Sequence, residues 1–367
     1  MIIFLRSLHD EAKSQHDKSI LKLIFAKPKQ TDDVYKSRHV SPRIEEAVLM
    51  RSYRFLVLLS AILLYAPVSH GQAAAPTPIF EFHSGFWMNL HHFLYKQAQP
   101  ISVEPSIAED LKVNAGPDWD AAVLYYKQKM ISRDMLFDDG MSEIKFALED
   151  QESAKTLKPS GQLTSELISV LEKAAPAYRE NWWHAHDTAN HQWIEAVSLL
   201  LNQYGETLVH ELSDAYKTDW ATNTIRVDVT SYANWSGAYT TIDPTRITIS
   251  AGDRANYETA ALEIVFHEAS HGISAKLMNL IAEECAKQKV ILPRRDLWHA
   301  VLFYTTGEIV RRHFAGYVPY GYKGLWERAW PMYIKRLEQD WLPYVNGKTS
   351  FDAAIAVLVH DVGQPIK

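Results

Sequence analysis

The chain has very little cysteine. Cys285 is the only thiol in 367 residues, so no disulfide can form within the chain. It lies in the helical pattern of residues 280–286, where a cysteine is more commonly a small buried side chain than a nucleophile. A protein without disulfides is compatible with a bacterial periplasm, with the exterior and with the cytosol.

The sequence also lacks the signatures of several protein classes. At a net charge of −6, no basic block indicates a nucleic-acid partner and no acidic tail indicates a solvating role. There is no internal repeat, no P-loop and no G-x-G-x-x-G segment after a predicted strand. The composition is that of an ordinary globular protein, with 47% apolar and 22% charged residues, and the length suffices for two domains or one large one.

An apolar run at residues 55–68 is too short to span a bilayer of about 30 Å. Two arginines precede it and a small-x-small segment follows at residues 71–73, which is typical of a secretory signal peptide over residues 50–73. Because this pattern begins at Met50, we expect residues 1–49 to be a non-native upstream extension; the alternative is a cytoplasmic extension before a signal anchor. The pattern predicts a secreted or periplasmic protein with no stable membrane span after signal cleavage.

Helical periodicity dominates residues 74–220, which we predict to form a helical N-terminal region. The aromatic segment at residues 80–95 is predicted as a core helix. We expect the last helical pattern of this region to begin after a break at Pro176 and to be interrupted near Gly205. That last pattern covers residues 178–216, and the earlier ones cover residues 118–129, 134–149 and 164–173.

Two histidine-rich segments lie in this region. Residues 83–92 contain three histidines, two of them adjacent and therefore about 100° apart on a helix, which is no ready chelate. In residues 182–191, His184, Asp187 and His191 share one helix face and could bind a metal. A solvated polar face, or the wall of a groove beside another site, is the commoner outcome of such a pattern. The roles of both segments stay open at this point.

The pattern changes after residue 220. Alternating and β-branched residues predict three strands, at residues 224–230, 238–242 and 246–250. Gly237 would let another backbone approach closely, as an edge strand that receives an extended peptide requires. Helical patterns then continue to residues 351–360. The predicted fold class is therefore mainly α, of the α+β type, with a small sheet early in a second region at residues 221–367.

Directly after the predicted sheet comes the pattern His267-Glu268-x-x-His271. It lies on a mostly apolar helical segment for which Asn256 would be the N-cap. Positions i and i+4 share a helix face, so both imidazoles can point at one metal ion, and the intervening glutamate lies beside it. The alternative is an amphipathic helix with two partly exposed histidines. We favour a zinc site.

A catalytic zinc ion takes three protein ligands and keeps one open position, so a third ligand must come from elsewhere. The candidates are His299 and Glu308, which lie nine residues apart and therefore face opposite sides of a straight helix. We favour Glu308, because Arg311 or Arg312 could orient its carboxylate. His299 remains the alternative if the helix bends, and Glu308 would then form a surface ion pair.

Strands, a H-E-x-x-H helix and a glutamate on a later helix resemble the gluzincins, the thermolysin-like zinc metallopeptidases. The resemblance covers about residues 224–312. It implies that His267, His271 and Glu308 hold one zinc ion and that Glu268 is the general base. The final histidine of the metzincin pattern is missing after His271, which argues against that branch.

The resemblance also implies that residues 221–367 form a zincin-like catalytic core. There Glu268 would take a proton from zinc-bound water and pass it to the leaving amine of a peptide or protein substrate. An oxyanion donor would also be needed. The aromatic and histidine candidates for that role are Tyr304, His313, Tyr317, Tyr320 and Tyr322. Two alternatives to a metallopeptidase stay open: a binding protein of this fold without turnover, and a zinc hydrolase of a non-peptide amide or ester.

Overall fold

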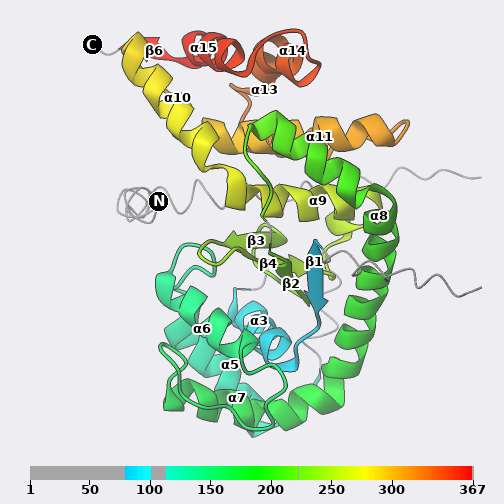
Figure 1. The fold of residues 1–367 in the computed structure, drawn as a ribbon. Coiled ribbons are helices and arrows are strands. Elements are labelled where there is room, and N and C mark those ends of the chain that lie inside the picture. Colours follow the sequence, from blue (N-terminus) through cyan, green and yellow to red (C-terminus); the bar gives the residue numbers. More distant parts are fainter. Residues whose placement is uncertain (1–78, 101–112, 222, 366–367) are drawn as a thin grey trace, which may run out of the picture. The chain divides into compact units, whose positions relative to one another are not determined.

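A four-stranded mixed sheet lies between two groups of helices (Figure 1). Its strand order is β1-β2-β4-β3, with parallel pairing from β1 to β4 and antiparallel pairing of β3 with β4. Strand β3 is therefore an edge strand. The bounds are β1 (Phe80–His83), β2 (Ile225–Thr230), β3 (Ala238–Thr241) and β4 (Arg246–Ser250). The predicted α+β class is confirmed, and so are the three predicted strands.

The structure is a computed structural model that describes residues 79–100, 113–221 and 223–365. The described residues all belong to one compact unit. The predicted upstream extension at residues 1–49 and the predicted signal peptide at residues 50–73 lie outside them. Within the described residues, no helix combines the length and the apolar character needed to cross a membrane.

The two faces of the sheet carry different side chains. Val227, Val229 and Ile247 lie on one face and belong to a core formed with α8 (His184–Tyr216), α9 (Thr259–Ser270), α11 (Leu297–His313) and α15 (Phe351–Val362). On the other face lie the buried polar side chains of Asp228 and Thr248, beside a second core formed by helices α3 (Phe86–Ala98), α5 (Pro117–Tyr125), α6 (Asp139–Glu149) and α7 (Ser165–Tyr178). This alternation follows from the period of two along a strand. The sheet thus separates two hydrophobic cores.

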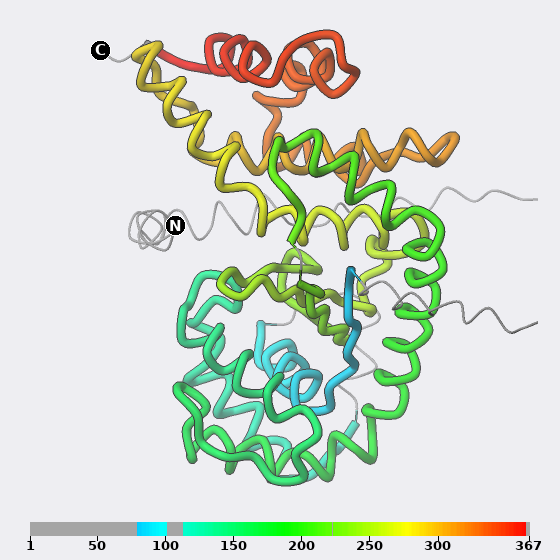
Figure 2. Tube along the Cα trace, viewed as in Figure 1, coloured from blue at the N-terminus to red at the C-terminus, as the bar shows by residue number. Residues whose placement is uncertain are grey.

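The helices of the second core precede the other helices in the sequence. Figure 2 shows the trace passing from them along α8 to the helices on the opposite face of the sheet. The helices of the second core are α3 (Phe86–Ala98), α5 (Pro117–Tyr125), α6 (Asp139–Glu149) and α7 (Ser165–Tyr178). The connecting helix is α8 (His184–Tyr216). The later helices are α9 (Thr259–Ser270), α10 (Ala275–Gln288), α11 (Leu297–His313), α12 (Leu325–Ala329), α13 (Ile334–Arg336), α14 (Leu342–Val345) and α15 (Phe351–Val362). A two-stranded sheet joins β5 (Val290–Ile291) and β6 (Gln364–Pro365).

The predicted single helix over residues 80–95 is wrong. Its first part is strand β1, which pairs with β2 from a distant part of the chain, and α3 begins only at Phe86. Phe80 packs edge-on against Phe266 of α9, with ring centroids 5.4 Å apart. The region at residues 74–220 thus supplies a strand and helix α8 to the same core as the region at residues 221–367, so the two predicted regions share one sheet.

The predicted interruptions at Pro176 and Gly205 are also wrong. Helix α7 continues through Pro176 to Tyr178 and passes through a π-helical turn into α8. Helix α8 runs through Gly205 without a break, and a Cβ atom there would lie 3.3 Å from the Ile79 side chain. This glycine provides close packing between α8 and the segment before β1, and tertiary contacts outweigh its low helix propensity.

Candidate metal centre

Helix α9 carries the predicted motif through the interior of the protein. Residues 260–270 are all buried, with β3 and β4 on one side and α8 and α11 on the other. Asn256 does not cap this helix as predicted: α9 begins at Thr259, and the Asn256 amide donates to the carbonyls of Gly237 and Ser250 at 3.0 and 3.1 Å. The histidine motif thus sits on a helix that packing fixes on every side.

Three histidines converge at the end of this helix. The ligand atoms of His267, His271 and His299 all lie within 4.8 Å of one another. The Nε2 atoms of His267 and His299 are 3.2 Å apart. Two nitrogens bound at about 2.05 Å to a tetrahedral zinc ion lie about 3.3 Å apart, so this pair already has the separation of two ligands of one ion. Among the described residues, this is the one group of histidine, cysteine, aspartate and glutamate side chains with such geometry.

All three imidazoles are in the form that binds metals. Burial lowers the pKa of His299 to about 3, and the nearby charge of Arg294 adds to the effect. Burial also holds the pKa values of His267 and His271 well below the usual range, and the neighbouring histidines add to this. The three rings are therefore neutral at physiological pH, and their nitrogen lone pairs are not blocked by protons. This donor set fits a catalytic zinc ion.

Glu308, which we predicted as the third ligand, does not lie with the histidines. Its carboxylate pairs with Arg311, and the charges of Arg312 and Glu338 also influence its pKa, whereas none of the three histidines does. Helix α11 is continuous from Leu297 to His313 despite Gly307, so the nine-residue separation turns Glu308 away from His299. The third place in the cluster belongs to His299, the alternative that the sequence left open.

Glu268 is buried and points toward the edge of the sheet. Thr240, in strand β3, donates to its Oε2 at 2.7 Å and to its main-chain carbonyl at 2.9 Å. Burial raises the pKa of the Glu268 carboxyl to about 7, and the bond from Thr240 opposes this rise. A carboxyl with a pKa near 7 can both accept and return a proton at physiological pH.

Of the four candidate tyrosines, Tyr320 is the one whose ring stacks on an aromatic neighbour of the histidine cluster. Its ring stacks on Phe303, with centroids 6.2 Å apart, and Phe303 stacks on His267 at 3.5 Å. Burial raises the pKa of the Tyr320 hydroxyl, the charges of Asp253, Glu263 and Glu268 raise it further, and the charge of Arg328 opposes the rise. The hydroxyl therefore stays protonated and lies within electrostatic range of Glu268, as a hydrogen-bond donor at this site requires.

The other predicted donors are engaged elsewhere. The hydroxyl of Tyr317 donates to Glu263 at 2.7 Å, and that of Tyr322 donates to Glu338 at 2.9 Å. The hydroxyl of Tyr304 is hydrogen-bonded to Tyr322. His313, the remaining candidate, pairs with Glu211 at 2.9 Å. The sequence could not separate these five residues because all lie within twenty positions of one another.

The two histidine-rich segments lie apart from the cluster. His92 contacts Tyr239 at 3.0 Å on the polar face of the sheet. In the second segment Asp187 accepts a hydrogen bond from Ser84 at 2.8 Å and forms an ion pair with the exposed His191 at 3.2 Å. The structure thus favours structural and solvated roles for them.

Three residues beside the cluster were not singled out from the sequence: Phe303, Thr240 and Glu263. Thr240 lies in a predicted strand, but the partner of a strand residue on a distant helix cannot be read from alternation. Glu263 did carry a signal, because it precedes His267 by four positions and therefore shares its helix face.

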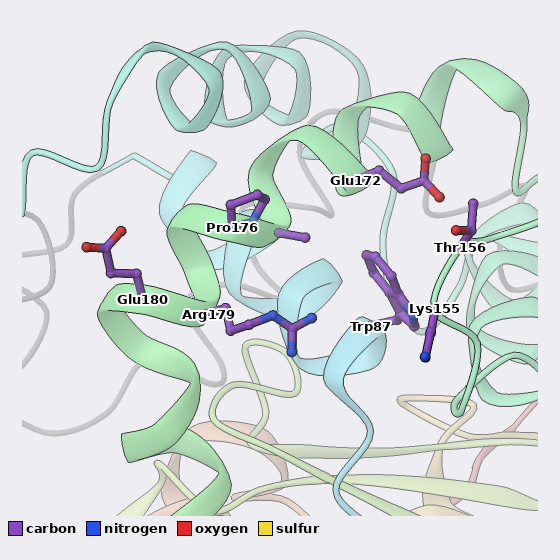
Figure 3. Close-up of a pocket in the computed structure, with 8 residues that line it drawn as sticks. Trp87, Lys155, Thr156, Glu172, Pro176, Arg179 and Glu180 are labelled. Carbon is purple, nitrogen blue, oxygen red and sulfur yellow. The ribbon is translucent and has the colours of Figure 1, made fainter.

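A surface hollow of about 500 Å³ lies elsewhere, between α3 and α7. Figure 3 shows Arg179 extending toward Trp87, while Glu180 points away. None of the predicted site residues belongs to this hollow, and its charged groups project from the surface. The residues that line it are Trp87, Lys155, Thr156, Glu172, Ala175, Pro176, Arg179 and Glu180. We therefore assign the chemistry to the histidine cluster.

Comparison with known proteins returns no match, whether to a family model, to a curated protein or to a solved structure.

Proposed function

We propose that the chain is a zinc-dependent hydrolase that cleaves peptide bonds. The observation that carries this proposal is the convergence of His267, His271 and His299 next to a buried glutamate of raised pKa. A third histidine departs from the glutamate of the gluzincin pattern. The proposal therefore depends on the cluster itself, and membership of that family remains a prediction.

The three neutral imidazoles would hold the ion and leave one position open for substrate or water. When bound, zinc supplies Lewis acidity, which polarises a carbonyl group and makes water a stronger acid. Glu268 would accept the proton of the attacking water and hand it to the leaving amine. The hydrogen bond from Thr240 holds one carboxylate oxygen of Glu268 and so fixes the orientation of the base.

Tyr320 would stabilise the negative charge that develops on the carbonyl oxygen of the substrate. Its hydroxyl stays protonated because burial and nearby carboxylates raise its pKa. A preorganised donor of this kind contributes roughly 10²–10³-fold to turnover. Phe303, between the Tyr320 ring and His267, would keep the two groups at a constant separation and exclude water.

A peptide is favoured over a small ester or amide because an edge strand lies beside the base. Strand β3 pairs with β4 along one side, and Thr240 of this strand contacts Glu268. An extended peptide could add to the other side of β3 through main-chain hydrogen bonds, which would place a peptide bond near Glu268. A protein that only binds its partner would have no need of a base at this position.

The experiment measures zinc content and hydrolysis of a quenched fluorescent peptide library by the chain from residue 74 onward. We expect about one zinc per chain and measurable cleavage. Glu268→Gln should keep the zinc and lower turnover by at least about 10²-fold, since general base catalysis contributes roughly 10²–10⁴.

Absence of bound metal after zinc is supplied would overturn the proposal. Bound zinc with no cleavage of peptides, but with hydrolysis of nitrophenyl esters, would instead identify a non-peptide hydrolase. Undiminished turnover in Glu268→Gln would remove the base assignment.

A further inference from the structure

A second buried carboxylate lies on the histidine face of α9. Glu263 precedes His267 by four residues, so the two side chains share one side of α9, and His271 follows in the turn directly after the helix. Glu263 is fully buried. It lies outside the histidine cluster, and the chemistry proposed above does not use it.

Both oxygens of this carboxylate bind the loop between α11 and α12. The hydroxyl of Tyr317 donates to Oε2 at 2.7 Å, and the main-chain N–H of Tyr320 lies 3.1 Å from Oε1 and 3.0 Å from Oε2. These bonds connect helix α9, which carries His267, directly to the residue whose ring stacks on Phe303 beside that histidine.

The loop also packs tightly against α11. A Cβ atom at Gly307 would lie 2.8 Å from Cβ of Pro319 and 3.1 Å from Oε1 of Glu263. The absence of a side chain at Gly307 thus lets the loop approach both helices. Glu263 stands where α9, α11 and the loop meet.

The position of Tyr320 follows from these contacts. Its main chain is fixed by Glu263, and its ring lies on Phe303, which in turn lies on His267. Tyr320 lies in a loop, and loops are the more mobile parts of a fold. These contacts therefore restrict the position of its hydroxyl. A donor that stabilises a transition state must be held in place before the reaction, to within a fraction of an ångström.

We propose that Glu263 is a positioning residue, which holds Tyr320 against Phe303 beside the histidine cluster by binding the Tyr317 hydroxyl and the Tyr320 amide. The expected effect of Glu263 on turnover rests on the proposed function, whereas its role in holding the loop does not. Burying a carboxylate is unfavourable unless several donors satisfy it, and here two donors from one loop do so. Burial also raises the pKa of Glu263 to about 7.

The kinetic test compares Glu263→Ala, Tyr320→Phe and the double variant on the quenched peptide library. We expect each single variant to lower kcat by about 10²-fold with little change in KM, the size of effect typical of a lost oxyanion donor. The double variant should be no slower than Tyr320→Phe, because Glu263 acts through Tyr320. Multiplied losses would mean that Glu263 acts independently of Tyr320 and would overturn the proposal.

Two further variants keep the test valid if Glu263→Ala folds poorly. Glu263→Gln can accept from the Tyr320 amide and donate to the Tyr317 oxygen, so we expect its kcat to stay within about threefold of the parent chain. Tyr317→Phe removes one of the two anchors and should lower kcat partially. Tyr322→Phe is the matched control, since its hydroxyl binds Glu338, and it should leave kcat unchanged.

A measurement without turnover separates this inference from the proposed function. 3-Fluorotyrosine at position 320 should give one narrow ¹⁹F resonance, distinct from free fluorotyrosine, in the parent chain and in Glu263→Gln. In Glu263→Ala the resonance should broaden or move toward the free value. An unchanged resonance would overturn the positioning role even in an active enzyme. If the parent chain cleaves no peptide but Glu263→Ala still loses the narrow resonance, the positioning role is supported although the proposed function fails.

Discussion

Histidine side chains pack against one another more favourably when they are uncharged, because protonated rings repel one another. Burial keeps the pKa values of all three rings in the cluster below the usual range, so like-charge repulsion does not separate them at physiological pH. The same burial leaves their lone pairs available. Because metal binding by histidine requires deprotonated nitrogen, the fold provides a donor set that releases almost no protons when an ion binds.

The assignment of the third ligand can be tested at the level of one residue. We expect His299→Ala to weaken zinc binding by more than the roughly 10–100-fold that loss of an outer partner costs. Glu308→Ala should leave zinc affinity within about threefold, because this carboxylate pairs with Arg311. Competition titration against a chromophoric chelator measures both. Retained affinity in His299→Ala together with lost affinity in Glu308→Ala would restore the assignment predicted from the sequence.

The buried carboxyl of Glu263 makes stability depend on pH. Its pKa is raised from 4.5 to about 7 in the folded chain, so the folded state holds this proton more tightly than the unfolded state. The stabilisation is fully present below pH 4.5 and is lost as pH rises through 7, by about 3 kcal/mol at roughly 1.4 kcal/mol per pKa unit.

Glu263→Gln should abolish this dependence while leaving other groups in place. Chemical denaturation of the parent chain and the variant between pH 4.5 and 7.5 measures it. We expect the variant to gain about 3 kcal/mol relative to the parent across this range. A difference between the two chains that does not change with pH would show that the carboxyl is not perturbed.

At the scale of elements, local sequence patterns predicted a strand or helix correctly where tertiary contacts favour the same structure as the pattern. The strands β2, β3 and β4 were predicted because β-branched residues alternate there. Strand β1 was not, because four aromatic-rich residues become a strand only through pairing with β2, which lies more than a hundred positions away. A breaker such as Pro176 was misjudged because a π-helical turn follows it and continues the helix.

The candidate site, too, was predictable only where local spacing determines it. Helical spacing alone placed His267 and His271 together, since i and i+4 share a face whatever the helix packs against. The choice between His299 and Glu308 was different, because it depends on which side of α11 faces α9. That orientation is set by packing between elements, and the spacing of two residues on one helix cannot predict it.

Contact between α11 and the Tyr320 loop gives a prediction for Gly307→Ala. The new methyl group would lie 2.8 Å from Pro319, so the loop must move away from α11. We expect turnover of the peptide library to fall ten- to hundredfold, as about 1 Å of displacement can cost roughly 10²-fold, with zinc content unchanged. Gly205→Ala, a helical substitution remote from the site, should leave turnover unaffected. Unchanged turnover in Gly307→Ala would show that the loop need not be close-packed for catalysis.

For the whole chain, the sheet separates two cores that should respond differently to zinc. The ligands come from α9 and α11, or from the turn directly after α9, and both helices belong to the core that includes α8 and α15. The second core, around α3, α5, α6 and α7, supplies none of the three histidines. An ion that links α9 to α11 should therefore stabilise one side of the sheet directly.

We expect zinc at a hundred times its Kd to stabilise the folded chain by about 2.7 kcal/mol. At roughly 2 °C per kcal/mol for a protein of this size, the Tm should rise by about 5 °C, and a chelator should reverse the rise. Hydrogen exchange should slow most in α9 and α11 and least in α5 and α7, because only opening of the first two breaks the bonds to zinc. His299→Ala at the same zinc concentration should show neither change. Equal protection of both cores would mean that the two sides of the sheet open as one cooperative unit, and that zinc acts on the fold as a whole.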